Sequence, residues 1–299
     1  MGLIVENLSV RIGATSILKE IDFTIAPGER FAILGESGAG KTLIAMSILR
    51  LLPRDSVLEG RIYLGNDELT TRSEPEMERV RGRRIGMVFE QPWSSLNPVF
   101  SCGSQIAHAV RLHHRVTPRA ARERATDLIE RVGLPRDRYS AYPRQMSGGM
   151  QQRIAIALAL AGSPELIIAD EPGTALDPAR LDRISHLFER ITAEIGAALL
   201  LITHQLALAR SLCANGAVLY AGEIVEMAAI PELLDRPRHP YTQALRAAII
   251  PEGFRPIPGT APEFSSLPHG CRFQLRCPFA VAHCEQPQQL MNGSRCWRS

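Results

Sequence analysis

The sequence lacks any uninterrupted apolar run of the roughly 18 to 20 residues that crossing a lipid bilayer requires. Its longest apolar stretches, 154–161 and 197–202, are short and predict core strands or buried helix faces. Residues 1–6 lack the basic side chains that open a signal peptide, and Glu6 argues against a myristoylation signal. We therefore expect a cytosolic chain that acts at a membrane only from outside the bilayer.

The sequence also lacks a large excess of charge of either sign, because its 34 Lys and Arg residues are nearly balanced by 31 Asp and Glu residues, which gives a formal net charge of +3. Such a balance gives no support for a protein that binds nucleic acid through a basic surface. The sequence has no internal repeat and no low-complexity tract. With 45% hydrophobic and 22% charged residues, its composition is that of a globular protein rather than a disordered one.

Short β-rich runs alternate with helical patterns over about the first 230 residues, which predicts an α/β fold. An antiparallel edge is expected from 4–8 and 21–25, and a late hairpin, broken by Gly222 and Glu223, from 218–221 and 224–227. Other runs are continuously apolar, as in strands of a sheet covered on both faces. They lie at 31–34, 85–89, 166–169 and 199–203.

From about residue 92 to 160 the pattern is helical. Residues 119–132 place their apolar side chains on one helix face and their charged side chains on the opposite face. The apolar residues are Ala121, Ala125, Leu128, Ile129 and Val132. Beyond about residue 235, Pro and Cys increase and the periodicity fades. We expect one domain over 1–234, with its helical part at about 92–160, and a small module over 235–299.

A glycine-rich segment follows the strand expected at 31–34 and precedes a helix expected at 43–52. It fits the pattern G-x-x-x-x-G-K-[ST], whose glycines allow the backbone N–H groups to face phosphates. Lys41 would neutralise phosphate charge, and the Thr42 hydroxyl would ligate Mg²⁺. The candidate ATP-binding residues of this loop are Gly35, Glu36, Ser37, Gly38, Ala39, Gly40, Lys41 and Thr42.

The run at 166–169 ends in two carboxylates, Asp170 and Glu171. Together with the glycine-rich loop, they suggest that Asp170 holds Mg²⁺ and that Glu171 polarises an attacking water. His204 ends the run at 199–203, from which it could contact the γ-phosphate. Two solvated acids and a structural histidine are the alternatives.

The segment Ser147-Gly148-Gly149-Met150-Gln151-Gln152-Arg153, expected to open a helix at 151–161, resembles the signature of ABC-type ATPases. The resemblance implies a P-loop fold with a mixed central sheet, an antiparallel edge subdomain and a helical subdomain. It also implies that two copies pack head to tail, so that ATP on one contacts the signature of the other. Residues 175–177 match the family's dimer-contact loop. The implied contacts to the partner's ATP are Ser147, Gly148, Gly149, Gln151 and Asp177.

Two features of the sequence depart from the family pattern. Ile12 stands where family members usually carry an aromatic residue that stacks on adenine. Glu90 stands where the family has a glutamine that links Mg²⁺ to the membrane subunit, and Gln91 where close relatives have an acid. Glu90 and Gln91 remain candidates for ATP binding. A carboxylate at Glu90 adds negative charge beside the triphosphate, so our hypothesis is a slower or asymmetric site.

Residues 93–98 (WSSLNP) and 239–242 (HPYT) are similar to segments in the ATPase subunits of bacterial oligopeptide, dipeptide and nickel importers. This resemblance implies a subunit on the cytoplasmic face of the inner membrane. Its implied partners are two membrane permeases, a second ATPase that is a paralogue or a copy, and an extracytoplasmic solute-binding protein, with no nucleic acid. Residues 92–100 are the candidate permease-docking surface; the alternative is a Pro-capped loop with a buried Trp93.

Four of the six cysteines lie near the C-terminus at C-x5-C-x6-C-x11-C spacing: Cys271, Cys277, Cys284 and Cys296. A reducing compartment argues against two disulfides. Four thiolates suit Zn²⁺ or an iron–sulfur cluster, although the spacing matches neither a zinc ribbon nor a ferredoxin. Similar tails in the importer subfamily are associated with a [4Fe–4S] cluster. Unliganded buried thiols are a further alternative, and Cys102 and Cys213 are expected to be buried apolar residues.

Two other functions compete with an ATP-driven peptide importer. A soluble ABC-type ATPase on DNA or ribosomes would carry long coiled coils, zinc modules or two ATPase halves. This chain has one half, about 105 residues between Lys41 and Ser147, and no heptads. Ile12 and Glu90 suggest a partner subunit that binds ATP but hydrolyses it slowly. The intact residues Lys41, Glu171, Ser147 and His204 oppose this alternative. The transported solute, a peptide, nickel or another small molecule, is not encoded here.

Overall fold

The computed structural model describes residues 2–173, 178–249 and 256–298. The chain divides into two compact units. The central unit spans Arg72–Leu200, and the terminal unit joins Gly2–Thr71 to Leu201–Ser299. The predicted boundary between residues 234 and 235 stays a prediction.

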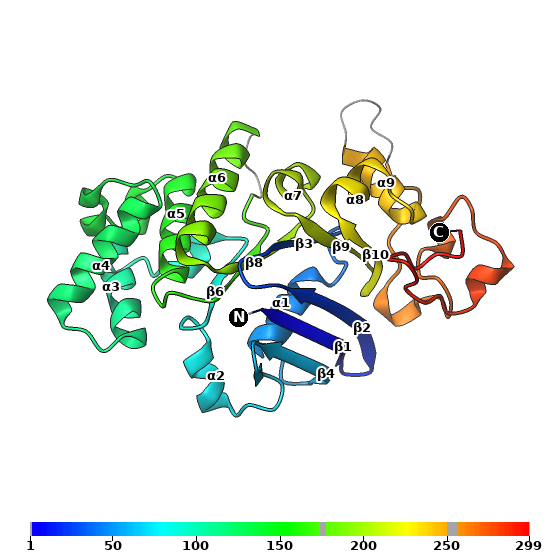
Figure 1. Cartoon of the computed structure of the whole chain (residues 1–299), viewed down its shortest axis with the longest axis horizontal. Helices are drawn as coiled ribbons and strands as arrows, with labels where there is room; N and C mark the ends of the chain where they lie inside the picture. Colours follow the sequence, from blue (N-terminus) through cyan, green and yellow to red (C-terminus); the bar gives the residue numbers. More distant parts are fainter. Residues whose placement is uncertain (1, 174–177, 250–255, 299) are drawn as a thin grey trace. The chain divides into compact units, whose positions relative to one another are not determined.

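The terminal unit contains the predicted antiparallel edge. β1 (Leu3–Ile12) and β2 (Thr15–Ile25) form a hairpin, and β4 (Ser56–Leu64) pairs with the other side of β1. A short β5 (Asp67–Glu68) completes the order β2-β1-β4-β5; Figure 1 labels the first three of these strands. Buried and exposed side chains alternate along much of β2, as expected for a sheet with one face in the core.

A second group of strands in this unit carries the glycine-rich loop. β3 (Arg30–Leu34) is buried from its second residue onward and runs parallel to β9 (Asn215–Tyr220). β9 pairs antiparallel with β10 (Glu223–Ala229), which confirms the predicted hairpin. The turn of this hairpin is Ala221-Gly222 rather than Gly222-Glu223. Ala221 and Gly222 have positive φ values of 45° and 82°, as a tight hairpin requires.

Among its described residues, the terminal unit also contains four α-helices. α1 (Lys41–Leu49) follows the glycine-rich loop, and the others are α7 (Leu206–Leu212), α8 (Ile230–Asp235) and α9 (Pro240–Ile249). α1 ends three residues before the predicted end at residue 52. The reason is Arg50, which adopts a left-handed conformation, so that its N–H caps the last carbonyls of the helix.

The part of the chain that follows α9, described over 256–298 and called the C-terminal extension below, contains short 3₁₀ turns and isolated bridges rather than long elements (Figure 1). It lies along β10. The Met227 N–H donates to the Gly293 carbonyl at 2.8 Å, and the Arg295 N–H donates to the Val225 carbonyl at 2.8 Å. Since an edge strand leaves backbone groups to be satisfied, the extension gives β10 partners on this side.

The central unit pairs two parallel strands, β6 (Ile85–Val88) and the fully buried β7 (Leu166–Asp170). Its helical part consists of α3 (Cys102–His113), α4 (Pro118–Arg131) and α5 (Gly148–Ala159), which pack on one another. Two further helices are α2 (Glu74–Val80) and α6 (Pro178–Ile195). β8 (Ala198–Thr203) begins in this unit and ends in the terminal one.

The apolar stripe predicted for residues 119–132 is confirmed. Ala121, Ala125, Ile129 and Val132 are buried, and Leu128 is partly buried. The helix begins one residue before the predicted range, because the Thr117 hydroxyl caps it by accepting from the Ala120 N–H at 3.3 Å.

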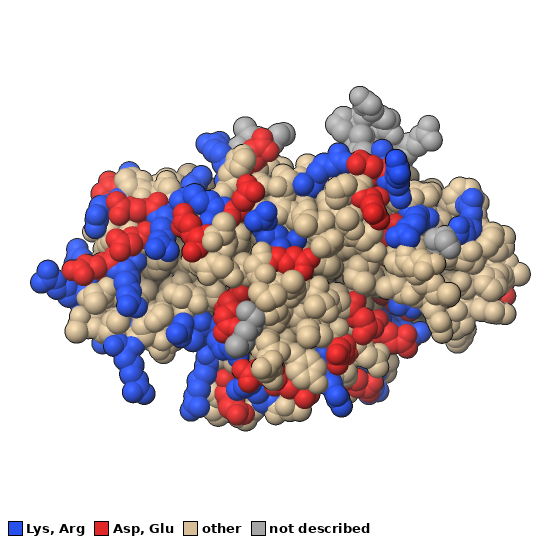
Figure 2. All heavy atoms as spheres, in the orientation of Figure 1, with Lys and Arg blue, Asp and Glu red and all other residues tan. Residues whose placement is uncertain are grey.

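No helix in the described parts of the chain is both long and apolar enough to cross a membrane. Figure 2 shows Lys and Arg interspersed with Asp and Glu over the face displayed. This mixture agrees with the small net charge and gives that face no broad field of one sign.

The β9–β10 turn provides a test of the fold. At Gly222, with φ of 82°, an added Cβ would lie 1.7 Å from the Ile17 carbonyl oxygen, whereas at Gly28, with φ of 71°, it would meet no atom within 4 Å. We expect Gly28→Ala to lower the free energy of unfolding by about 1 kcal/mol and Gly222→Ala by about 3 kcal/mol or more. Urea unfolding of the two variants measures the difference, and equal losses would contradict the assigned clash.

Candidate functional site

The glycine-rich loop, residues 35–42, joins β3 to α1 as the sequence predicts. Gly35 passes so close to β9 that an added Cβ would lie 2.3 Å from the Leu219 carbonyl oxygen. Gly40 has φ of 101° immediately before α1, a conformation that L-residues rarely adopt. Both glycines are therefore required by the backbone itself, and together they turn the loop toward the N-terminus of α1.

Lys41 lies inside the loop. Its side chain is buried, and Nζ donates to the carbonyls of Gly35 at 2.9 Å and Glu36 at 3.0 Å. Thr42, the next residue, is exposed. The loop thus encloses an ammonium group at the N-terminus of a helix, where the helix dipole also favours an anion.

α9 contacts the loop from the C-terminal side. The Glu36 N–H donates to the hydroxyl of Tyr241 at 2.9 Å. Tyr241 is fully buried against the rings of Tyr220 and Phe273, with centroid distances of 4.4 Å and 5.4 Å. Burial raises the pKa of Tyr241, so its hydroxyl stays protonated. In the sequence, Tyr241 contributed only to a family resemblance, and its contact with the loop was not predicted.

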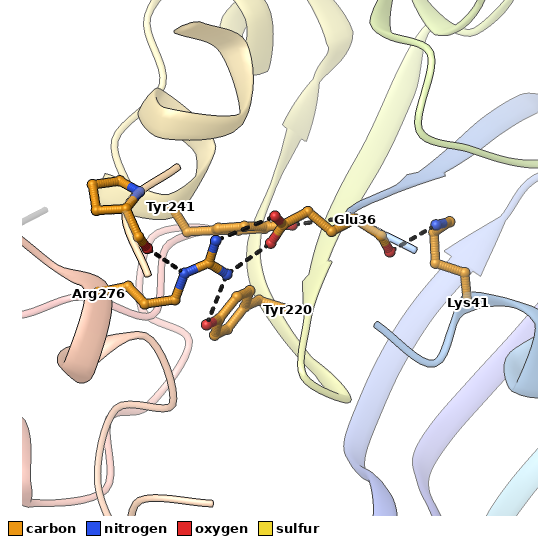
Figure 3. A network of polar contacts seen from close by, with 6 residues as sticks. Glu36, Lys41, Tyr220, Tyr241 and Arg276 are labelled. Atoms are coloured by element: carbon orange, nitrogen blue, oxygen red, sulfur yellow. Dashed lines mark hydrogen bonds and ion pairs between the residues drawn. The ribbon is translucent and has the colours of Figure 1, made fainter. Parts of the chain in front are cut away.

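Arg276 of the C-terminal extension contacts the same loop residue through its side chain (Figure 3). Its Nη1 donates to Oε2 of Glu36 at 2.9 Å and its Nη2 to Oε1 at 3.3 Å. Nε donates to the Pro258 carbonyl at 2.7 Å, and Nη1 also donates to the Tyr220 hydroxyl at 3.3 Å. Burial opposes the charge, but the bonds with Glu36 and Tyr220 outweigh it and raise the pKa of Arg276.

Asp170 and Glu171 lie in the central unit, at the end of β7, and both are buried. Glu171 has φ of 47°, the left-handed region that costs a non-glycine residue about 1–3 kcal/mol and is common at active sites. His204, half-buried, directly follows β8 and belongs to the terminal unit with the loop. Asp177 lies outside the described residues.

The predicted signature lies at the N-terminus of α5. The helix begins at Gly148, three residues before the expected start at residue 151, because the Ser147 hydroxyl caps it by accepting from the Met150 N–H at 3.4 Å. An added Cβ at Gly148 or Gly149 would meet no atom within 4 Å. Packing among the described residues therefore does not require these glycines. Gln151 donates to the Pro143 carbonyl at 2.8 Å, within its own segment.

One pocket of the central unit brings several predicted residues together. It is lined by Glu90, Gln91 and Trp93 and by the signature residues Ser147, Gly148 and Gly149. Trp93 is 60% exposed, which overturns the alternative of a buried tryptophan, and Val99 and Phe100 are 70% and 56% exposed. The segment following β6 therefore presents three large apolar side chains to solvent.

The four C-terminal cysteines line one small pocket of the terminal unit. Burial raises the pKa of Cys271 to about 11, so this thiol is protonated near neutral pH. Within the described residues, no group of three or more His, Cys, Asp or Glu side chains is arranged to hold a metal ion. Cys102 and Cys213 are buried, as predicted, and their pKa values are raised to about 11 and about 12 by burial.

Comparison with known protein families gives two matches. Residues 18–174 match a family described as ABC transporter, and residues 225–284 match one described as the C-terminal region of oligopeptide/dipeptide transporters. The second match includes Tyr241, Arg276 and three of the four C-terminal cysteines.

Curated relatives extend over nearly the whole chain. A Brucella melitensis protein named for peptide import and ATP binding is 41% identical, covering 98% of this chain and 93% of its own. A Sinorhizobium fredii protein named as the probable ATP-binding protein of a peptide ABC transporter is 41% identical, covering 95% of this chain and 90% of its own.

Solved structures give the same fold. A dimeric ATP-binding cassette in a post-hydrolysis state, bound to ADP and phosphate, has a TM-score of 0.68 and 28% identity, covering 76% of this chain and 98% of its own. CbiO1 from Clostridium perfringens, part of an ABC transporter complex, has a TM-score of 0.70 and 25% identity, covering 84% of this chain and 95% of its own.

Proposed function

Since the chain belongs to the ABC transporter family of ATP-binding subunits, as its motifs predicted, we propose that it hydrolyses ATP to drive a bacterial peptide importer. The observation that carries the peptide assignment is the C-terminal region, which matches that of oligopeptide/dipeptide transporters. The names of the relatives at 41% identity also favour peptides over nickel.

ATP would bind with its phosphates on the glycine-rich loop. Lys41 already lies at the N-terminus of α1, where it would exchange its contacts with the loop carbonyls for contacts with phosphate oxygens. Thr42 and Asp170 are the proposed Mg²⁺ ligands, since hydroxyl and carboxylate oxygens suit this ion. When bound, Mg²⁺ supplies positive charge beside the triphosphate. Glu90 and Gln91 complete the proposed ATP contacts.

Hydrolysis requires a base for the attacking water. We assign this role to Glu171, which is buried and held at φ of 47°, and a γ-phosphate contact to His204. A second ATPase subunit, a paralogue or a copy, would place its signature on this ATP. Gly148 and Gly149 support this arrangement, because their open Cβ positions leave room for a partner's phosphate. Ser147, Gln151 and Asp177 are the other proposed contacts between subunits.

Substitution of Glu171 tests the assigned chemistry. In the assembled transporter, Glu171→Gln is expected to slow ATP hydrolysis about 100-fold or more while ATP binding is retained, because only proton acceptance is removed. Phosphate release and binding of a non-hydrolysable ATP analogue are the two measurements.

The matched control is Glu165→Gln, which removes a carboxylate immediately before β7 that pairs with Arg84 at 2.7 Å. This variant should hydrolyse ATP within about twofold of wild type. Glu171→Gln activity above about one tenth of wild type would contradict the assigned base.

The exposed segment 92–100 is proposed to dock on a permease at the cytoplasmic face of the inner membrane. Trp93, Val99 and Phe100 are more than half exposed, an arrangement typical of a surface that a partner covers. The same segment lines a pocket with the signature residues, so a permease bound here would contact the part of the subunit that meets the partner's ATP. Two permeases and an extracytoplasmic solute-binding protein complete the proposed assembly.

Double substitution Trp93→Ala/Phe100→Ala tests the docking surface. We expect the variant to lose co-purification with the permeases while keeping its helical circular dichroism, because both side chains are exposed. Leu112→Ala is the matched control, since Leu112 is 73% exposed but lies outside the segment. Equal permease recovery from the double variant and the control would contradict the assignment.

The four-cysteine pocket is proposed to hold a [4Fe–4S] cluster. The support is the convergence of four thiols on one pocket of a chain segment that has little regular structure. Within the described residues, no group of three or more such side chains is arranged to hold a metal ion, so this geometry does not separate the cluster from the Zn²⁺ alternative, and the preference for a cluster comes from the resemblance to importer tails. When bound, the cluster would join the turns of the extension by metal–ligand bonds.

Metal analysis of anaerobically purified protein decides between these alternatives. We expect about four iron and four sulfide per chain, lost in Cys284→Ser and retained in Cys213→Ser, whose cysteine lies elsewhere in the unit. One zinc without sulfide would support the Zn²⁺ alternative. Absence of both metals would contradict a cluster and leave unliganded thiols.

A further inference from the structure

Glu36 is an acidic residue in a loop proposed to bind a polyanion. A carboxylate beside a triphosphate repels it and lowers its affinity, unless a cation neutralises the carboxylate or draws it away. The loop's own lysine is directed elsewhere: Nζ of Lys41 bonds the Gly35 and Glu36 carbonyl oxygens. The cation at the Glu36 carboxylate is Arg276, which comes from the C-terminal extension.

The geometry of this pair is specific. Two guanidinium nitrogens of Arg276 face the two carboxylate oxygens of Glu36, at 2.9 Å and 3.3 Å. The guanidinium also donates to the Pro258 carbonyl and the Tyr220 hydroxyl, so groups other than Glu36 hold its orientation. The Arg276 side chain is 5% exposed and that of Glu36 31%, so solvent screens this contact less than a surface ion pair.

The backbone of the same residue is held independently. The Glu36 N–H donates to Tyr241 of α9, and the ring of Tyr241 packs on Phe273, which begins the turn leading to Arg276. Both contacts reach Glu36 from the C-terminal part of the chain (Figure 3). The direction of the Glu36 side chain is therefore set by groups that belong neither to the loop nor to α1.

We propose that Arg276 is a positioning residue for ATP: it neutralises Glu36 and holds its carboxylate away from the phosphate chain, so that the loop accepts triphosphate. This role rests on the proposed ATP site. Arg276 contacts no reacting atom, so it acts on ATP affinity and not on the chemical step.

The test is a double-mutant cycle in the assembled transporter built with the full chain. Arg276→Gln leaves the Glu36 charge uncompensated and should raise KM for ATP about tenfold with kcat within twofold. Glu36→Gln removes the charge that Arg276 compensates, so its KM should differ from that of wild type by less than about threefold. Because the charge is then gone, the double variant should match Glu36→Gln. This rescue is the expected signature, and a purely structural Arg276 would not produce it.

Arg295→Gln is the matched control. Arg295 precedes Cys296 as Arg276 precedes Cys277, and it hydrogen-bonds the Ile224 and Gln288 carbonyls rather than the loop. Its KM should stay within twofold of wild type. Because Arg276→Gln could fold poorly, Glu36→Gln and Arg276→Lys, which keeps the charge and should recover part of the affinity, provide independent readings.

Two results would overturn the role of Arg276. One is an unchanged KM in Arg276→Gln; the other is an equal rise in KM whether residue 36 is Glu or Gln. In either case an active wild-type complex leaves the proposed function standing. A wild-type complex that neither binds nor hydrolyses ATP would overturn the proposed function, and with it this role.

Discussion

The hydrogen bond from the Glu36 N–H to Tyr241, together with the close approach of Gly35 to Leu219, fixes where the phosphate loop lies. β9 provides the carbonyl that Gly35 passes, and the β9–β10 turn donates from the Gly222 N–H to the Ala39 carbonyl at 2.9 Å. A nucleotide loop near the N-terminus of the sequence is thus built against strands that come about 180 residues later. The backbone position of the loop is therefore set by contacts with those strands.

The C-terminal extension takes part in the same arrangement. It gives β10 backbone partners, and buried Arg272 pairs with buried Glu223 at 3.2 Å, next to the β9–β10 turn. Removing one partner of a buried pair leaves an uncompensated charge, so these contacts hold the extension in one place. Arg276 directly precedes Cys277, so one of the four cysteines that line the pocket shares a turn with the ion-pair partner of the loop.

Local patterns predicted the parts of the fold that depend on local chemistry. The continuous apolar runs identified β3, β6, β7 and β8, and the stripe from Ala121 to Val132 identified α4. Boundaries differed where one residue decides them: Arg50 ends α1 through its left-handed backbone, and Ser147 starts α5 through its cap. Neither effect is visible in apolar periodicity, because it depends on a dihedral angle and a hydrogen bond.

The glycine-rich loop, the segment that resembles the signature and the two carboxylates were predicted from sequence because each is a contiguous pattern. The contacts of Glu36 with Tyr241 and Arg276 were not, since they join positions 205 and 240 residues apart. A glutamate inside a phosphate-binding pattern was the available signal: its charge is unfavourable there, which predicts a cation elsewhere in the chain. The sequence does not identify which of its 34 basic residues supplies it.

Hydrogen exchange at the Glu36 amide tests most directly the claim that the C-terminal region holds the loop. The measurement uses the full chain without nucleotide and compares this amide with that of Ser37, an exposed neighbour in the same loop. The account predicts slow exchange at Glu36, because its N–H is bonded to the buried Tyr241 hydroxyl, and fast exchange at Ser37. Equally fast exchange at both amides would contradict it.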